Sequence, residues 1–444
     1  MTDGQKEGKP ARVPEAKQAG EVRDRWAWAE PCVWTERMLT ALETGVKGGK
    51  WFSLIDKVGS GRVLRWAFAR VKANGGSAGV DHQTIAMYEQ QLEQQTEYLG
   101  RALREGTYQP AAIRREWIPK PGSREKRPLG IPTVRDRVVQ KAIQATLEPI
   151  FERDFAEQSY GFRPGRSCKD ALRRVDQLLK EGQTWVVDAD LKSYFDTIPQ
   201  ARLMKLLEEK VADGRVLELI RQYLRQGVLE EMREWRPEAG TPQGAVISPL
   251  LSNIYLDPLD RLMAACGAEM IRYADDLVVL CQSEEAAQRA LALVQQWTAA
   301  VGLTLHPEKT RIVDATQAGG FDFLGYHFER GKRWPRRKSL QKFKYTVRVK
   351  TKRTNGQSLQ VIIARVNRTT KGWFGYFKHS NQYTFPPLDS WIRMRLRSIL
   401  RHRSGRRGRG RGYDQQRWPN AYFAAQGLFS LVAAHEQLRP PLTG

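Results

Sequence analysis

Long hydrophobic runs are what this sequence most clearly lacks. Among its 444 residues, 41% of which are hydrophobic, no apolar run approaches the length that spans a bilayer. Residues 1–20 are polar and lack the hydrophobic centre of a secretion signal. These absences argue against a membrane protein and predict an intracellular protein with no membrane partner. The length allows two to three domains and a substantial core.

Cysteine is scarce as well. The four cysteines (Cys32, Cys168, Cys266 and Cys281) are widely spaced, form no C-x-x-C pair and have no histidine pair nearby. This spacing argues against a zinc site and against a disulfide-stabilised scaffold. We therefore expect a reducing compartment, the bacterial cytoplasm or its nucleoid.

Acidic residues are nearly missing from residues 331–420. That segment holds 25 Lys and Arg against only Asp389 and Asp414, so it carries +23 of the net charge of +24. A solvated basic face rarely concentrates nearly all of the excess charge in a fifth of a chain. Binding to a polyanion such as nucleic acid explains the charge better. An anionic membrane fits less well, because Trp and Tyr are interleaved with the basic residues.

The apolar pattern mixes helical and strand periods without a strict β-α-β rhythm, which predicts an α+β fold with an antiparallel sheet. Residues 1–20 lack an apolar pattern and are expected to be disordered, and the basic repeat 401–412 is expected to stay unstructured until it meets nucleic acid. The expected helices cover 31–103 (with a loop at 74–81), 139–147, 167–179, 200–229, 240–255, 283–301, 359–366 and 391–400. The expected strands cover 114–119, 127–132, 185–191, 303–305, 311–313 and 321–328.

The tetrapeptide Tyr273-Ala274-Asp275-Asp276 is the most informative feature that is present. Its two adjacent carboxylates lie between apolar runs, which predicts a tight hairpin inside a covered sheet. A buried anion needs a counter-charge, and oxygen ligands suit Mg²⁺. Taken alone, the Asp-Asp pair is explained equally well as turn chemistry.

A carboxylate on another strand strengthens the metal interpretation. Asp188 and Asp190 share one face of the strand predicted at 185–191, because strand side chains alternate with a period of two. An acid on one strand, 85 residues before a hairpin with two more, is the pattern of a polymerase palm. Two Mg²⁺ ions bridged by these carboxylates would activate a primer 3′-hydroxyl and stabilise the pyrophosphate leaving group.

At these residues the chain resembles the group II intron-encoded reverse transcriptases and maturases. The resemblance covers roughly residues 50–425, and the ordered set of motifs is far more specific than any single one. It implies a right-hand polymerase with fingers, a palm with an antiparallel sheet, and an α-helical thumb/maturase domain. The motifs that carry it are NGGSAGVD (74–81), WIPKPGSREKRPLGIPTVRDRVVQ (117–140), SYGFRPGRSCKDAL (159–172), DLKSYFD (190–196), TPQGAVISPLLSNIYL (241–256), YADD (273–276), LHPEKT (305–310), FLGY (323–326), KGWFGYF (371–377) and the basic helix at 391–403.

The resemblance implies roles for single residues around the reacting atoms. Asp190, Asp275 and Asp276 are the expected catalytic and metal-binding triad, and Asp188 is either a supporting acid or a strand-end charge. Phe195 is expected to exclude a 2′-hydroxyl and so to select dNTPs, unless it is an ordinary core aromatic. The residues expected to bind the incoming nucleotide are Lys120, Arg127, Phe195, Gln243 and Lys309.

Further residues are expected to contact nucleic acid. Gly75, Gly76 and Gly79 would let their loop lie close to the template backbone. Arg163 and Arg166, at a helix start, form a candidate template-phosphate site, with simple capping and solvated arginines as the alternative. The expected contacts in the maturase region are Lys371, Arg393, Arg397, Arg401 and Arg403.

The sequence departs from the family at two places. Ala245 stands where the family more often has the second glycine of Gln-Gly-Gly, and no Cys pairs or His clusters of its endonuclease domain follow residue 423. Mobility of the intron would then need a primer supplied by the host. The expected organisation is a disordered N-terminus (1–30), an N-terminal extension and fingers (31–112), fingers and palm (113–330), a basic thumb/maturase domain (331–403) and a basic tail (404–444).

The resemblance implies an RNA-directed DNA polymerase that extends a DNA primer on an RNA template with dNTPs. It would also bind the structured intron RNA, promote its splicing and help it enter a DNA target. Two alternatives stay open: an RNA-binding splicing cofactor with a vestigial polymerase, and a reverse transcriptase of a defence or mutagenic retroelement. The sequence leaves the oligomeric state open.

Overall fold

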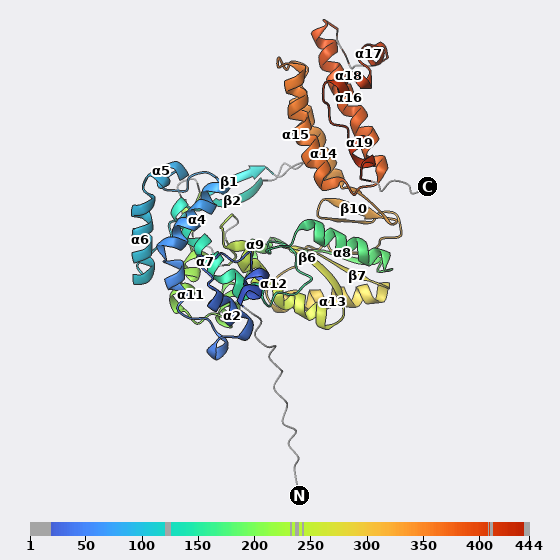
Figure 1. Ribbon diagram of the computed structural model, residues 1–444. Helices are drawn as coiled ribbons and strands as arrows, with labels where there is room; N and C mark the ends of the chain where they lie inside the picture. The colour runs from blue at the N-terminus through green and yellow to red at the C-terminus, as the bar shows by residue number, and fades with distance from the viewer. Residues whose placement is uncertain are drawn as a thin grey trace.

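The structure is a computed structural model that describes residues 19–119, 126–230, 233–235, 239–241, 244–406, 408 and 412–438. The described residues form three sheets and many helices. A helical N-terminal part, a part with a central sheet and a C-terminal group of helices follow one another along the chain (Figure 1). Within the described ranges, no helix combines the length and apolarity that crossing a membrane requires. The predicted fold class, α+β with an antiparallel central sheet, is confirmed.

The N-terminal half is mostly helical. Its helices are α1 (Ala19–Arg25), α2 (Glu36–Thr44), α3 (Ile55–Val58), α4 (Gly61–Asn74), α5 (Ile85–Gln90), α6 (Leu92–Glu105), α7 (Val134–Glu152), α8 (Cys168–Lys180), α9 (Tyr194–Thr197), α10 (Gln200–Glu208) and α11 (Gly214–Leu224). Helix α7 is central to this part, since α3, α4 and α5 all pack against it. Threonine side chains start α2, α5 and α7 by accepting a backbone N–H of the first turn.

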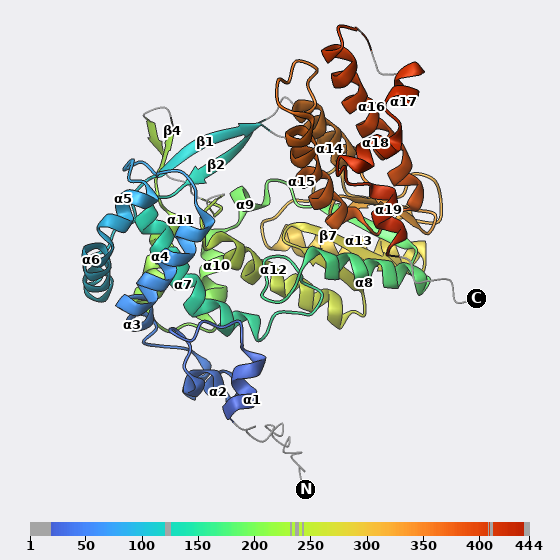
Figure 2. The same cartoon turned by 45° about the horizontal axis from the view of Figure 1, so that its top comes forward.

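The hairpin predicted between residues 113 and 134 is confirmed. Strands β1 (Ile113–Pro119) and β2 (Lys126–Ile131) pair antiparallel, and β4 (Val228–Glu230) and β5 (Arg233–Trp235) extend the sheet in the order β2-β1-β4-β5. In both Figure 1 and Figure 2 this hairpin points across the molecule toward α14 and α15.

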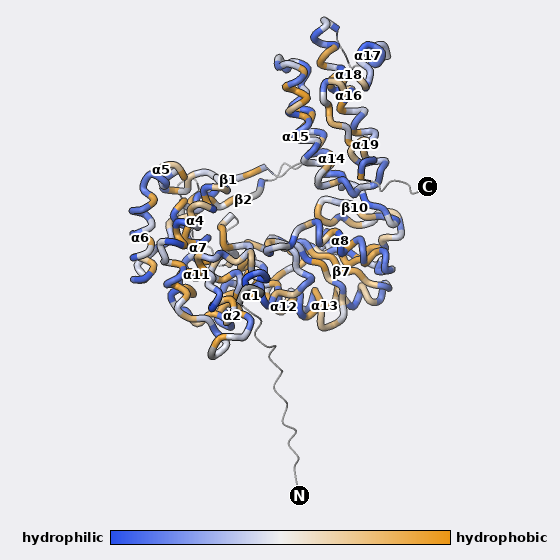
Figure 3. Tube along the Cα trace, viewed as in Figure 1, coloured by the Kyte–Doolittle hydropathy of each residue, from blue (hydrophilic) through white to orange (hydrophobic). Residues whose placement is uncertain are grey.

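The central sheet, here called the palm sheet, has the order β6-β7-β3-β8, and every pairing in it is antiparallel. Its strands are β3 (Trp185–Asp190), β6 (Glu269–Tyr273), β7 (Asp276–Cys281) and β8 (Arg311–Asp314). Alternate residues face α8 on one side and helices α12 (Ser248–Ala265) and α13 (Glu284–Ala300) on the other. Figure 3 shows the hydrophobic colour along β7, between α8 and α13. This double burial explains why β7 is apolar at every position from Leu277 to Cys281.

The basic part of the chain forms helices on a small sheet. Strands β9 (Phe321–Phe323), β10 (Tyr326–Glu329) and β11 (Lys332–Pro335) are ordered β11-β10-β9. The following helices, here called the thumb helices, enclose a separate apolar core. They are α14 (Arg337–Lys350), α15 (Leu359–Phe377), α16 (Phe385–Arg403), α17 (Tyr413–Arg417), α18 (Asn420–Ala425) and α19 (Leu431–Glu436).

The folded region starts earlier than expected. Disorder was predicted up to residue 30, but α1 begins at Ala19, and Val22 and Ala29 are buried. The guanidinium of Arg23 explains part of this order, because it donates hydrogen bonds to the carbonyl oxygens of Ala29 and Trp34. The many polar residues of this segment suggested disorder, and they gave no indication of the contacts that order it.

The folded region also extends further than expected. Residues from 404 onward were predicted to be a basic tail, yet α17, α18 and α19 lie beyond that point and close the core of the thumb helices. Phe423 and Leu431 are fully buried, and the buried carboxylate of Asp414 forms an ion pair with Arg401 at 2.6 Å. The apolar residues whose burial orders this segment are few and widely separated. The basic residues around them therefore led to the prediction of a tail.

Several predicted elements have different boundaries. The helix expected over 240–255 is α12, which begins at Ser248 and ends at Ala265. The helix expected over 200–229 is two helices, α10 and α11, followed by β4. The strand expected over 321–328 is the pair β9 and β10, because Leu324 and Gly325 form a turn with positive φ. Residues 303–305 make only one isolated bridge, in which Leu305 pairs with Leu191.

Candidate active site

Three carboxylates lie at one end of the palm sheet. Asp190 ends β3 and is the register partner of Asp276, which begins β7. Asp275 lies in the two-residue turn between β6 and β7, where Ala274 has a φ of 60°. The strands on both sides are largely apolar and buried, while Asp275 in the turn and Asp276 at the start of β7 are polar.

Asp276 binds its proton more tightly than an isolated aspartate does. Desolvation by the surrounding protein, followed by the negative charges of Asp275 and Asp190, raises the pKa of Asp276 to about 6. Desolvation likewise raises the pKa of Asp188 to about 6, although Arg311 opposes it through an ion pair at 3.6 Å. This concentration of negative charge favours bound cations.

Lys309 supplies one cation to this group. Its Nζ lies 2.5 Å from Oδ2 of Asp190, and the side chain remains largely exposed. The backbone brings it there, because His306, three residues earlier, donates its N–H to the carbonyl oxygen of Asp190. The structure thus joins two predicted site residues that are far apart in the sequence.

A cavity of about 830 Å³ opens beside the carboxylates. Asp190, Asp275, Lys309 and Phe195 all line it, as does Ala245, the residue at which the sequence departs from the family. Phe195 is half-buried on α9. The cavity is also lined by Phe162, an exposed aromatic residue with a φ of 57° that the sequence analysis did not single out.

The other residues predicted to bind nucleotide are described only in part. Lys120 and Gln243 lie outside the described residues. Arg127 belongs to β2, where it pairs with Ile118, and its side chain also lies outside the description. The backbone just before Gln243 is described, and Thr241 donates its N–H to the carbonyl oxygen of Phe195 at 2.6 Å.

The donor set is compatible with Mg²⁺ without enclosing it. Among the residues that the structure describes, no three acidic, His or Cys side chains are arranged as a ready metal cage. Mg²⁺ commonly binds through one or two carboxylates and completes its shell with water and substrate phosphates. Asp190 and Asp275, which both face the cavity, meet that requirement.

Arg163 does not form the predicted phosphate site. Its side chain is 3% exposed and forms an ion pair with Glu152 at 2.8 Å. It also donates to the carbonyl oxygens of Ala156 and Ser159, so its charge is used inside the protein. Arg166 remains half-exposed and donates to the carbonyl oxygen of Glu157.

Arg397 is likewise structural rather than available to RNA. It is 6% exposed, donates to the carbonyl oxygen of Trp418 and to the side chain of Asn420, and lies over the ring of Phe423. The remaining predicted contacts on these helices are at least partly accessible. They are Lys371, Arg393, Arg401 and Arg403.

The glycine loop before α5 packs against protein. A Cβ on Gly79 would lie 2.7 Å from the backbone of Thr133, and one on Gly76 would lie 2.9 Å from the guanidinium of Arg137. Gly75 faces open space. The small size of Gly79 is therefore explained by its contact with the start of α7, and the predicted approach to a template stays a prediction.

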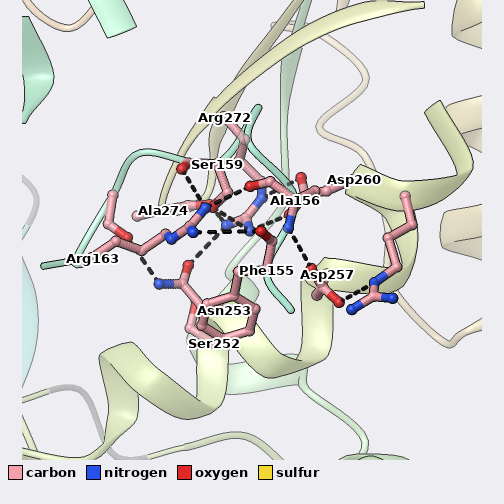
Figure 4. Close-up of polar contacts among 12 residues, drawn as sticks. Phe155, Ala156, Ser159, Arg163, Ser252, Asn253, Asp257, Asp260, Arg272 and Ala274 are labelled. Atoms are coloured by element: carbon pink, nitrogen blue, oxygen red, sulfur yellow. Dashed lines mark hydrogen bonds and ion pairs between the residues drawn. The ribbon is translucent and has the colours of Figure 1, made fainter. Parts of the chain in front are cut away.

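Sequence reasoning missed the support behind the Asp275 turn. Arg272 is fully buried and contacts Asp260, Asn253, Ser159 and the backbone of Ala274 (Figure 4). An arginine inside the apolar run before the Tyr-Ala-Asp-Asp tetrapeptide was the available signal, since a buried charge requires partners.

Comparison with known proteins agrees with this geometry. Residues 118–328, which contain the three carboxylates, match the family described as reverse transcriptase (RNA-dependent DNA polymerase). The class of the central part is therefore that of a reverse transcriptase. Residues 340–418 match the group II intron maturase-specific domain. This order of domains confirms the predicted family, the group II intron-encoded reverse transcriptases and maturases.

Individual proteins are also similar to parts of this chain. Group II intron-encoded protein LtrA of Lactococcus lactis subsp. cremoris is 40% identical over 171 residues, which is 38% of this chain and 28% of that protein. Protein YkfC of Escherichia coli K12 is 42% identical over 189 residues, which is 42% of this chain and 49% of that protein. The chain thus spans about half or less of the length of these relatives. Telomerase from Candida albicans in complex with a fragment of telomeric RNA has a TM-score of 0.42 and 14% identity, over 76% of this chain and 68% of that one.

Proposed function

We propose that this chain is an RNA-directed DNA polymerase that uses Asp190, Asp275 and Asp276 to extend a DNA primer on an RNA template. The observation that carries the proposal is the cluster of these carboxylates at one end of the palm sheet, where Asp190 and Asp275 line a cavity together with Phe195 and Lys309. Two divalent metal ions, when bound, would stabilise the negative charge on the reacting phosphate and lower the pKa of the attacking 3′-hydroxyl.

The protein's own residues would position the reactants and neutralise the charge of the phosphates. Asp190 and Asp275 would orient the metal-bound reactants. The raised pKa of Asp276 reflects desolvation first and then the negative charges of Asp275 and Asp190, which such cations would offset. Lys309 would leave Asp190 for the phosphates of the incoming dNTP. Phe195 would occupy the space that a ribose 2′-hydroxyl needs.

The basic helices support a second part of the proposal, the binding of structured intron RNA. Helix α14 carries five exposed basic residues while its apolar side packs into the thumb core through Phe343 and Val347. These five are Arg337, Lys338, Lys342, Lys344 and Arg348. We expect this surface to hold RNA phosphates, and so to promote intron splicing and entry of the intron into a DNA target.

Primer extension on an RNA template with dNTPs and Mg²⁺ tests the polymerase. The comparison is between the wild type, the Asp275→Ala/Asp276→Ala double variant, and Asp314→Ala as a control. Asp314 lies at the other end of the β3–β8 pair, opposite Trp185, so its loss should leave synthesis intact. Full-length cDNA from the wild type and the control alone is the expected result.

Intron RNA binding and splicing, measured on the same proteins, separate the alternatives. A wild type that binds and splices RNA but makes no cDNA would replace the polymerase by a splicing cofactor. Synthesis without any preference for intron RNA would favour a reverse transcriptase of another retroelement. The match to a maturase-specific domain at 340–418 favours the intron-encoded function over that last class.

A further inference from the structure

Arg272 occupies an unusual place for a charged residue. It lies on β6, an outer strand of the palm sheet, one position before Tyr273, and its side chain is 0% exposed. Asp260 on α12 is equally buried and forms a two-point ion pair with it, from Nε to Oδ1 at 2.8 Å and from Nη2 to Oδ2 at 2.5 Å. A buried pair of this kind is weak evidence for net stability, so the other groups that the guanidinium contacts are the more informative feature.

Every N–H of the guanidinium has an acceptor. Beyond the two bonds to Asp260, Nη2 donates to Oγ of Ser159 at 2.7 Å, and Nη1 donates to Oδ1 of Asn253 at 3.0 Å. The fifth donor reaches the carbonyl oxygen of Ala274 at 2.9 Å. The guanidinium therefore joins α12, the loop before α8 and the turn of the hairpin (Figure 4).

The bond to Ala274 acts on the peptide group that leads directly into Asp275. Ala274 has a φ of 60°, a conformation that a residue with a Cβ adopts only at a cost. Such a turn persists when its surroundings hold it. The loop at 158–161 also holds the strand that leads into the turn. The backbone N–H of Arg272 donates to the carbonyl oxygen of Gln158, and the N–H of Tyr160 donates to the carbonyl oxygen of Arg272.

Asn253 connects the two supports. Its Oδ1 accepts from Arg272, while its Nδ2 donates to the carbonyl oxygen of Gly161 at 2.8 Å. Gly161 lies directly against the backbone of Ala274. The turn is thus held by hydrogen bonds on one side and by close packing on the other.

We propose that Arg272 is a positioning residue, which fixes the orientation of the Asp275 carboxylate by holding the carbonyl group of Ala274. The proposal rests on the proposed function of Asp275 as a metal-binding residue. Arg272 itself touches neither substrate nor metal, because it is enclosed by protein. Its loss should therefore weaken metal binding and turnover while the affinity for primer and template stays unchanged.

Arg272→Lys is the informative substitution. Lysine keeps the positive charge beside Asp260 but cannot reproduce the planar fork that also reaches Ala274 and Asn253. Asp213→Ala is the matched control, because Asp213 is also buried and caps α11 through the N–H groups of Arg215 and Val216, away from the palm sheet. Both variants are expected to lower the thermal midpoint.

Two measurements distinguish positioning from general destabilisation. The first is the affinity for Mn²⁺ without nucleic acid, followed by calorimetric titration, and the second is the split between kcat and KM in primer extension. Arg272→Lys should weaken Mn²⁺ binding by about 10-fold and lower kcat by about 10²-fold, with KM for the primer–template unchanged. Asp213→Ala should leave all three values at those of the wild type.

Several outcomes would overturn the proposal. Arg272→Lys with the Mn²⁺ affinity and kcat of the control would reduce Arg272 to a structural residue. If that variant does not fold, Asn253→Ala takes its place. It keeps the Asp260 pair but removes the acceptor that helps to orient Nη1, the nitrogen that donates to Ala274, and it removes the link to Gly161. An unchanged Mn²⁺ affinity in Asn253→Ala would likewise refute the positioning role. A wild type that binds Mn²⁺ but makes no cDNA would instead contradict the proposed polymerase and leave the Mn²⁺ comparison standing.

Discussion

Replacing Gly161 with alanine measures how closely the turn that carries Asp275 is supported. A Cβ at residue 161 would lie 2.2 Å from the backbone nitrogen of Ala274 and 2.8 Å from the carbonyl carbon of Tyr273. Ordinary contact needs roughly 1 Å more, so either the turn or the loop must move by about that distance. The loop is poorly placed to move, because Asn253 holds the carbonyl oxygen of Gly161.

The expected effect is larger on activity than on stability. Overpacking of this size costs about 1–3 kcal/mol of unfolding free energy. A displacement of about 1 Å at a reacting group can lower turnover by about 10²-fold. Gly161→Ala should therefore remain folded and bind primer–template, yet extend the primer far more slowly than the wild type.

The assay is steady-state primer extension beside thermal unfolding, with Gly214→Ala as the control. Gly214 begins α11, and a Cβ there meets no heavy atom within 4 Å, so its replacement should leave turnover unchanged. Stability of the control should be unchanged or slightly higher, because alanine restricts the unfolded chain. Wild-type turnover by Gly161→Ala would refute the close support of the turn.

Two further predictions concern selectivity and pH. Phe195→Ala should raise incorporation of rNTPs relative to dNTPs, measured by competition in single-nucleotide extension, because the ring lines the cavity beside Asp190 and Asp275; unchanged sugar selectivity would remove Phe195 as the gate. Burial raises the pKa of Glu148 on α7 from 4.5 to about 7, so the folded protein holds this proton more tightly than the unfolded chain. Stability should then fall by roughly 1–3 kcal/mol as the pH rises from about 4.5 to 7, and urea unfolding of Glu148→Gln should show a flatter profile; an identical profile in both proteins would contradict this assignment.

The sequence predicted best what is fixed by local patterns. The hairpin around Asp275 follows from apolar strands on both sides of two acids. The helix expected over 167–179 is α8, and it starts with a capping box between Ser167 and Asp170, a pair three residues apart in the sequence. Neither required knowledge of distant contacts.

The errors come from charged residues whose partners are distant in the chain. Arg163 and Arg397 were expected at the surface, but both are buried. Arg163 forms an ion pair with Glu152, and Arg397 donates a hydrogen bond to the carbonyl oxygen of Trp418. Arg272 was overlooked for the same reason, since Asp260 lies 12 residues earlier on another element. A charged residue is expected to be exposed unless the fold supplies a buried group that pairs with it. The sequence alone does not show which group that is.

Closure of the thumb core by its last helices has a consequence during synthesis. Helix α16 buries Phe385 and Leu396 in a core that also needs Phe423 and Leu431, which are translated later. At ordinary elongation rates, residues 404–436 take roughly 2–7 s to appear, and for that time the nascent chain presents an uncovered apolar helix face. A ribosome that stops after Arg403 would release a chain with this face exposed, which we expect chaperones and proteases to remove.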